Sequence, residues 1–138
     1  MNWNSRTQLL VGEEGVKKLA SSHVLVVGLG GVGAYAAEQL ARAGIGKLTI
    51  IDCDTVNITN KNRQLLALDS TIGRPKVEVM AERIRDINPD CKVRAICKLY
   101  TEEDKLEFFD TDYSYIADCI DLVSCKLSLI MNARERKI

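Results

Sequence analysis

A glycine-rich segment at residues 28–33 is the strongest candidate for a chemical site in the sequence. Its glycines are Gly28, Gly30, Gly31 and Gly33. Gly28 permits a tight turn, Gly30 lets backbone N–H groups approach phosphate oxygens, and Gly33 lets a following helix pack closely against a strand. The free amides and the dipole of that helix's first turn attract an anion. The segment therefore predicts that a nucleotide binds here by its phosphates.

An acidic residue and a long polar segment follow the second apolar run of the chain. The run is Leu48–Ile51, and Asp52 comes directly after it. A carboxylate at the end of a parallel strand can accept hydrogen bonds from the hydroxyls of a ribose. Residues 53–64 are rich in Asn, Asp and Thr, which favour turns. Because doubly wound folds bind ligands at the carboxyl ends of their strands, we expect this polar segment to border the ligand.

Two cations, an amide and a second acid are expected to join the glycine turn at that edge of the sheet. They are Arg63, Lys76, Asn60 and Asp121. Together with the turn they suit a triphosphate that is attacked at phosphorus. Arg63 and Lys76 would neutralise the charge that develops on the phosphates, and Asp121 would hold Mg²⁺. Hydride transfer by a nicotinamide enzyme needs a proton donor instead, and it gives these residues no shared task.

Aliphatic runs alternate with helical segments and form the framework for these residues. The first run, from Val24 to Val27, is uninterrupted, as expected of a central parallel strand that is covered on both faces. Because crossover connections are right-handed, we predict an α/β fold, a Rossmann-like doubly wound and mostly parallel sheet in the order 3-2-1-4. The predicted strands are residues 23–27, 47–51, 92–96 and 113–117.

The remaining segments divide the chain into an arm and a domain. Residues 1–22 form an N-terminal arm and helix, in which Val16, Leu19 and Ala20 are expected to face inward, and residues 23–138 form the nucleotide-binding domain. Doubly wound folds normally continue beyond four strands, so the sheet is expected to be truncated, as the N-terminal part of a longer domain. The predicted helices are residues 13–21, 32–43, 75–87, 101–109 and 122–136.

Composition limits the class of protein. The 138 residues include 19 basic and 19 acidic side chains, so the net charge gives no sign of nucleic-acid or membrane binding. No apolar stretch approaches the roughly 20 residues that span a bilayer, and the N-terminus does not resemble a signal peptide, so we expect a cytoplasmic protein. Five cysteines without a CxxC pair argue against a disulfide framework or a zinc knuckle, and we expect most of them to be small buried residues.

These motifs together resemble the ThiF/MoeB/HesA family of adenylating enzymes, which are related to the ubiquitin-activating enzymes. The resemblance extends from Arg6 to the end of the chain and implies ATP as the substrate nucleotide. Its most specific matches are residues 28–33, 52–54, 59–64, 73–76 and 118–121.

The resemblance also implies roles for individual residues. Arg63 and Lys76 would stabilise the transition state and Asp121 would bind Mg²⁺, with Asp52 on the ribose. Arg6 matches the family's N-terminal arginine, which reaches into the partner subunit's site, so the resemblance implies a homodimer in which Arg6 is catalytic in trans. By position, the cofactor-binding residues would be Gly28, Gly30, Gly31, Gly33, Asp52, Asp54, Asn60, Arg63, Lys76 and Asp121.

Within the family, the chain is most similar to the tRNA threonylcarbamoyladenosine dehydratase branch. Residues 5–15, 78–84 and 113–115 support this narrower resemblance. It implies ATP-dependent cyclisation of the threonylcarbamoyl group on an adenosine of tRNA. The side-chain carboxylate would become an acyl adenylate with release of pyrophosphate. An intramolecular attack would then displace AMP.

Three alternatives remain open at this point. One is adenylation of the C-terminal glycine of a ubiquitin-like sulfur-carrier protein, which would use the same residues. The others are an NAD-dependent oxidoreductase and a non-catalytic nucleotide-binding domain. Leu122 stands where relatives usually have Asn or Ser, which puts one polar contact near the metal in question. The isolated segment is also expected to have little activity, because later segments complete the acceptor pocket in the family.

Overall fold

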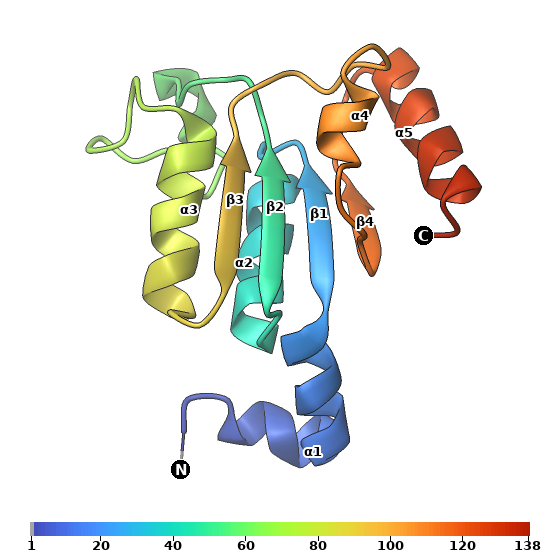
Figure 1. The fold of residues 1–138 in the computed structure, drawn as a ribbon. Coiled ribbons are helices and arrows are strands. Elements are labelled where there is room, and N and C mark those ends of the chain that lie inside the picture. Colours follow the sequence, from blue (N-terminus) through green and yellow to red (C-terminus); the bar gives the residue numbers. More distant parts are fainter. Residues whose placement is uncertain (1) are drawn as a thin grey trace.

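A parallel sheet of four strands forms the centre of the computed structural model, which describes residues 2–138 (Figure 1). The strands are β1 (His23–Val27), β2 (Lys47–Ile51), β3 (Lys92–Ile96) and β4 (Tyr115–Asp118). Their order across the sheet is β3-β2-β1-β4, and every neighbouring pair is parallel. The predicted α/β fold class and strand order are therefore confirmed.

Helices cover both faces of this sheet. Helices α2 and α3 pack on one face, and α4 and α5 pack on the other, so the domain has three layers (Figure 1). The helices are α1 (Ser5–Ser21), α2 (Gly33–Ala43), α3 (Lys76–Ile87), α4 (Lys105–Phe108), α5 (Val123–Glu135) and the 3₁₀ turn η1 (Ile58–Asn60). Among these described residues, no helix combines the length and the apolar composition needed to cross a membrane.

Each face of the sheet has its own apolar core. Successive side chains of a strand point to opposite faces, so the two cores take alternate residues. Because both faces are covered, the residues Val24–Val27 of β1 are at most 3% exposed, which explains their uninterrupted aliphatic run. The strands place Val24, Val26, Leu48 and Ile50 under α2 and α3. They place Leu25, Val27, Ile51 and Ile96 under α4 and α5.

The fourth strand and the helix before it differ from their predicted bounds. The strand begins at Tyr115 and not at residue 113, because the Tyr113 ring packs into the core under α4 and its hydroxyl donates a 2.6 Å hydrogen bond to the carbonyl of Phe108. The helix predicted at residues 101–109 is only Lys105–Phe108. Residues ahead of it form a turn in which Thr101 and Asp104 hydrogen-bond to each other.

The N-terminal helix departs further from the prediction. One element, α1, runs from Ser5 to Ser21 with a break at Gly12, whose φ of 75° lies in the left-handed region. It lies beyond the amino ends of the strands, away from the sheet faces (Figure 1). None of its residues is fully buried; Leu19 packs against the core as predicted, but Ala20 is exposed, so the predicted inward position is wrong for Ala20. Near its end, α1 meets the domain where the Gly46 amide donates to the carbonyl of Leu19.

Candidate nucleotide-binding site

A cavity of about 730 Å³ opens at the carboxyl ends of the strands. Its walls come from the glycine turn after β1, the segments after β2, β3 and β4, residues 60–64 and the starts of α3 and α5. Parallel sheets of this kind place their ligands at this edge. Of the predicted site residues, it is lined by Gly28, Gly30, Gly31, Asp52, Asp54, Asn60, Arg63, Lys76 and Asp121.

The backbone of the glycine turn requires glycine at two positions. Gly28 has a φ of 93°, and a Cβ there would lie 2.5 Å from the carbonyl oxygen of Cys119. A Cβ on Gly33 would overlap the carbonyl oxygen of Gly28, so α2 packs against the turn only because this side chain is missing. At Gly30 and Gly31 the nearest atoms to an added Cβ are 3.7 and 3.8 Å away, so these two glycines leave free space in the cavity wall.

Asp52 holds this turn in place from the end of β2. One carboxylate oxygen accepts a 2.7 Å hydrogen bond from the backbone amide of Leu29, and the other accepts a 2.7 Å bond from the amide of Asp54. Hydrogen bonds from backbone amides to a carboxylate are among the stronger ones in proteins. Each oxygen keeps a further lone pair, and Asp52 lines the cavity, which suits the ribose contact that the sequence predicts.

Lys76 is a nearly buried cation at the first turn of α3. Its side chain is 6% exposed, and its Nζ lies 3.7 Å from a carboxylate oxygen of Asp54. The backbone amide of Lys76 also donates to the carbonyl of Asp54, and Thr55 pairs with Pro75 next to it. This local pairing brings the start of α3 back to the end of β2. The lysine is thus fixed beside the cavity with one exposed carboxylate as its partner.

The polar segment after β2 folds into a short 3₁₀ turn that presents Arg63. Asn57 and Asn60 cap this turn reciprocally, since the Asn60 side chain accepts from the Asn57 amide. The Arg63 guanidinium donates to the Asn62 side chain at 2.9 Å and to the Thr59 carbonyl at 3.3 Å. Within residues 2–138, no carboxylate forms an ion pair with Arg63. Its charge is therefore available to an anion in the cavity.

The opposite wall carries two acids and a lysine at the end of β4 and the start of α5. Lys126 and Asp118 form an ion pair of 2.8 Å at the cavity rim. Asp121 is exposed in the cavity wall, and in the described part of the chain its carboxylate has no ion pair. A carboxylate without a protein cation, close to a site for phosphates, is a suitable ligand for a divalent metal ion.

Some lining residues were missed by the sequence reasoning. They are Lys98, Leu99 and Tyr100, which follow β3, and Lys126 in the first turns of α5. The signal for the first three was available, because they follow the carboxyl end of a predicted strand. They were overlooked because this stretch lacks the run of Asn, Asp and Thr that marked the segment after β2.

Two predicted site residues do not line the cavity. Gly33 lies beneath the turn, where it allows the close packing described above. Arg6 is exposed on α1, which lies at the other end of the strands (Figure 1). Within one chain, Arg6 and the cavity are therefore not brought together.

The cysteines near the cavity are not activated thiols. Partial desolvation of the thiol and the neighbouring Asp54 raise the pKa of Cys53, and burial and Asp118 raise the pKa of Cys119. A raised pKa keeps a thiol protonated at neutral pH and so lowers its nucleophilicity. The prediction that most of the cysteines are buried is wrong for Cys53 and Cys97, which are exposed, and Cys119 is only half-buried. These three follow the carboxyl ends of strands, where the sheet borders an open cavity.

The chain is similar to several known proteins over nearly its whole length. It is 48% identical over 134 residues to the tRNA threonylcarbamoyladenosine dehydratase of Bacillus subtilis, covering 97% of this chain and 53% of that protein. It is 40% identical over 125 residues to the molybdopterin-synthase adenylyltransferase of Salmonella typhimurium, covering 91% and 50%. The chain thus spans about half the length of the curated relatives it matches.

A solved structure agrees with the fold. The Escherichia coli tRNA N6-threonylcarbamoyladenosine dehydratase, TcdA, solved in complex with ATP, matches with a TM-score of 0.95 and 47% identity. The match covers 97% of this chain and 55% of that one. The sequence profile of the ThiF family matches residues 4–137. With this match, and with the glycine turn, the acids and the cations at one edge of a 3-2-1-4 sheet, the chain belongs to the ThiF family.

Proposed function

We propose that the protein containing this chain uses ATP to adenylate a carboxylate, and that the carboxylate belongs to threonylcarbamoyladenosine in tRNA. The observation that carries the proposal is the convergence of Arg63, Lys76 and Asp121 on one cavity beside the glycine turn. The similarity to tRNA threonylcarbamoyladenosine dehydratases supports the choice of acceptor. A tRNA acceptor would place the reaction in the cytoplasm.

The reaction needs two displacements. A carboxylate oxygen of the acceptor attacks the α-phosphorus of ATP, the bond from that phosphorus to the bridging oxygen of the β-phosphate breaks, and pyrophosphate leaves with its negative charge. An atom of the same threonylcarbamoyl group then attacks the acyl carbon and AMP leaves, which closes a ring with net loss of water. Adenylation is needed because hydroxide is a poor leaving group from a carboxylate.

The cations of the site have distinct tasks in the first displacement. Lys76 is nearly buried and held at 3.7 Å from Asp54, so its charge is fixed in a poorly hydrated place, where it stabilises charge on the phosphates most strongly. Arg63 lies on the exposed side of the cavity and can form two parallel hydrogen bonds to phosphate oxygens. The backbone amides of the glycine turn bind the phosphates, and Asp52 keeps that turn rigid.

The residues also fit a magnesium ion. Mg²⁺ is bound in proteins by one or two carboxylates together with substrate phosphates and water. Asp121 offers such a carboxylate in the cavity wall. When bound, the ion would neutralise negative charge on the phosphates of ATP.

The arm of residues 1–22 is proposed to complete a second copy's site. Arg6 cannot serve its own cavity, because α1 lies beyond the amino ends of the strands (Figure 1). Leu9 and Leu10 on the same helix are 89% and 86% exposed, which suits an apolar contact with another chain. A homodimer would bury these residues and bring Arg6 to the partner's phosphates.

A sulfur-carrier protein is the second candidate acceptor. The 40% identity to a molybdopterin-synthase adenylyltransferase favours it, because the chemistry of the adenylation step would be the same. An NAD-dependent oxidoreductase is disfavoured, since it leaves Arg63, Lys76 and Asp121 without a shared task.

The decisive experiment is exchange of labelled pyrophosphate into ATP by the full-length protein, with modified tRNA or a sulfur-carrier protein as acceptor. We expect exchange that depends on the tRNA and disappears in Arg63→Ala. Dependence on the carrier would select the second candidate. Tight binding of NAD without ATP turnover would contradict adenylation.

A further inference from the structure

The connection between β3 and α4 forms one wall of the cavity. It leaves β3 and crosses the carboxyl ends of the other strands to reach α4 on the far side of the sheet (Figure 1). Lys98, Leu99 and Tyr100 of this connection line the cavity. Leu99 is 49% exposed, so packing alone does not fix its position. Tyr100, in contrast, packs into the core beside Phe108, so this wall is held by that ring together with polar contacts at the end of the connection.

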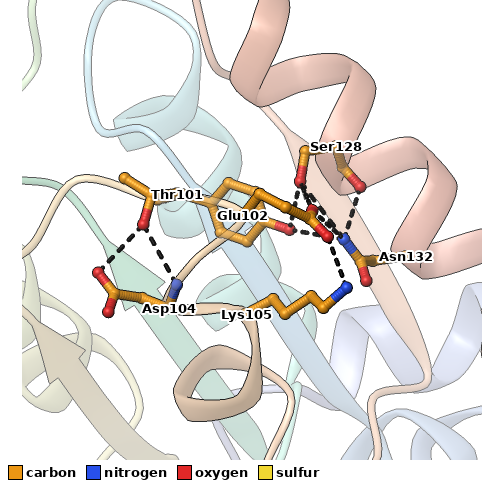
Figure 2. A network of polar contacts seen from close by, with 7 residues as sticks. Thr101, Glu102, Asp104, Lys105, Ser128 and Asn132 are labelled. Atoms are coloured by element: carbon orange, nitrogen blue, oxygen red, sulfur yellow. Dashed lines mark hydrogen bonds and ion pairs between the residues drawn. The ribbon is translucent and has the colours of Figure 1, made fainter.

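A network of polar side chains holds the end of the connection against α5. Figure 2 shows Glu102 of the connection facing Ser128 and Asn132 of α5, with Lys105 of α4 beside it. Asn132 donates a 2.9 Å hydrogen bond to Glu102, and the Ser128 hydroxyl also donates to that carboxylate. Lys105 donates to the other carboxylate oxygen at 2.5 Å.

The cavity-lining tyrosine belongs to the same network. The Tyr100 hydroxyl lies 3.3 Å from the Ser128 hydroxyl and 3.2 Å from the amide nitrogen of Asn132. Tyr100 is 2% exposed and Asn132 is 4% exposed, so the inner part of the network is shielded from water. The amide nitrogen of Asn132 has two hydrogens, and its shortest bonds, both 2.9 Å, go to the Ser128 carbonyl and to Glu102. Without Glu102, this nearly buried donor would lose one of its two shortest hydrogen bonds, which is costly.

The charge of Glu102 is constant at the pH values where enzymes of this kind would work. The hydrogen bonds from Lys105 first, and then from Ser128 and Asn132, lower the pKa of Glu102 to about 2. The side chain is about half exposed, so the ion pair with Lys105 contributes little by itself. The effect of the network comes from its position, because it joins the wall after β3 to α5, which begins just after Asp121 and carries Lys126.

We propose that Glu102 and Asn132 are positioning residues for nucleotide binding, which hold Leu99 and Tyr100 at a fixed distance from the α5 wall. Neither residue lines the cavity, so both act through the wall they hold. The inference depends on the proposed function in one respect, namely that the cavity binds ATP. It adds that the affinity for ATP depends on a contact on the outer side of the wall, away from the phosphates.

The test is the dissociation constant for ATP of full-length Glu102→Ala, measured by calorimetry together with its melting temperature. Asp110→Ala is the matched control, because it breaks the 2.7 Å ion pair with Arg94 next to α4, has a similarly exposed carboxylate and lies outside the cavity. We expect a similar loss of melting temperature in both variants. Only Glu102→Ala should raise the dissociation constant, by roughly fivefold to tenfold. Glu102→Gln keeps an oxygen that accepts from Ser128 and Asn132 and should restore most of the affinity.

The outcomes separate this inference from the proposed function. If the wild-type protein binds no ATP, both are wrong. If it binds ATP and the two alanine variants bind it equally well, or lose affinity equally, the network has only a structural role and the inference is overturned. Should Glu102→Ala fail to fold, Ser128→Ala tests the same contact from α5, and an unchanged dissociation constant there would overturn the inference as well.

Discussion

The backbone amide of Leu29 donates a 2.7 Å hydrogen bond to the carboxylate of Asp52, so the glycine turn after β1 is fixed by the end of β2. The second oxygen of the carboxylate holds the amide of Asp54 in the same way. Replacing Asp52 by alanine leaves two amides without a protein partner. We expect the free energy of unfolding to fall by about 1–3 kcal/mol and the affinity for ATP to fall with it. Urea unfolding checks the first effect, and Asp69→Asn, at an exposed residue of the following loop, should change it by less than about 0.5 kcal/mol.

Replacing two glycines of the same turn by alanine should have different effects, on stability at Gly33 and on ATP binding at Gly30. A methyl group at Gly33 would overlap the Gly28 carbonyl, so Gly33→Ala should destabilise the fold by about 3 kcal/mol or more. At Gly30 the nearest atom to an added Cβ is 3.7 Å away and the methyl group would enter the cavity, so Gly30→Ala should fold normally and bind ATP weakly. Melting temperature and ATP titration measure the two effects. Equal stability of the two variants would contradict the packing argument.

Lys76 should affect the chemical step far more than the stability of the complex with ATP. Because its charge is nearly buried beside the phosphates, Lys76→Ala should lower kcat of pyrophosphate exchange about 100-fold to 1000-fold, with a smaller change in KM for ATP. Lys61→Ala is the control, since that lysine is exposed and forms an ion pair with Asp69 in the segment between β2 and α3. Its kcat should remain at the wild-type value. A normal kcat for Lys76→Ala would exclude the lysine from the reaction.

Arg6 can be tested by mixing two inactive variants. If Arg6 acts in the partner's site, a dimer of Arg6→Ala with Arg63→Ala contains one site in which both arginines are present. Equal amounts of the two variants, unfolded and refolded together, should therefore recover about a quarter of the wild-type activity. Each variant refolded alone provides the baseline. No recovery would mean that both arginines serve the same chain or that the protein is not a dimer.

Acidification below neutral pH should weaken the fold through His23. Its Nε2 lies 2.8 Å from the hydroxyl of buried Thr49, and burial followed by the charge of Lys47 lowers the pKa of His23 below the ordinary value of 6.5. The neutral ring is thus favoured in the folded state. Its contribution to stability is present above pH 6.5 and is lost as the pH falls through the lowered pKa.

The measurement is the free energy of unfolding between pH 7.5 and about 5. Over this range the paired carboxylates, such as Glu38 with its lowered pKa, remain charged in the folded protein and contribute little to the slope. The slope of the unfolding free energy against pH should be clearly smaller in His23→Gln, which keeps a polar side chain near Thr49. An unchanged slope would assign the pH dependence to other groups.

The parts of the fold that follow from local sequence were predicted well. The bounds of β1, β2 and β3 agree with the predictions, because each is a short run of residues ended by turn or polar residues. The site residues from Gly28 to Lys76 follow strand ends or open a helix, so their meeting at one edge follows from topology. Tyr113 was misplaced because its ring prefers the core under α4 to a position in the strand.

Other features depend on contacts between distant segments and could not be predicted. The hydrogen bond between Glu102 and Asn132 joins two residues that no sequence motif or periodicity links. They meet only because the β3–α4 connection crosses the sheet to reach α5. The burial along α1 is a second example. Leu19 packs against the core but Ala20 beside it is exposed, and α1 has no fully buried residue, because the helix lies beyond the amino ends of the strands.

The position of β1 between β2 and β4 has a consequence for the order of folding during synthesis. β1 can pair with β2 once residues 23–51 have been made, whereas its other edge pairs with β4, which lies at residues 115–118. Short loops close faster than long ones, so the β1–α2–β2 unit should form first. The glycine turn and Asp52 would then be in place while the Tyr100 wall and α5 are still being made. The phosphate half of the site would thus serve as an early folding nucleus, and the wall with its network would complete the site last.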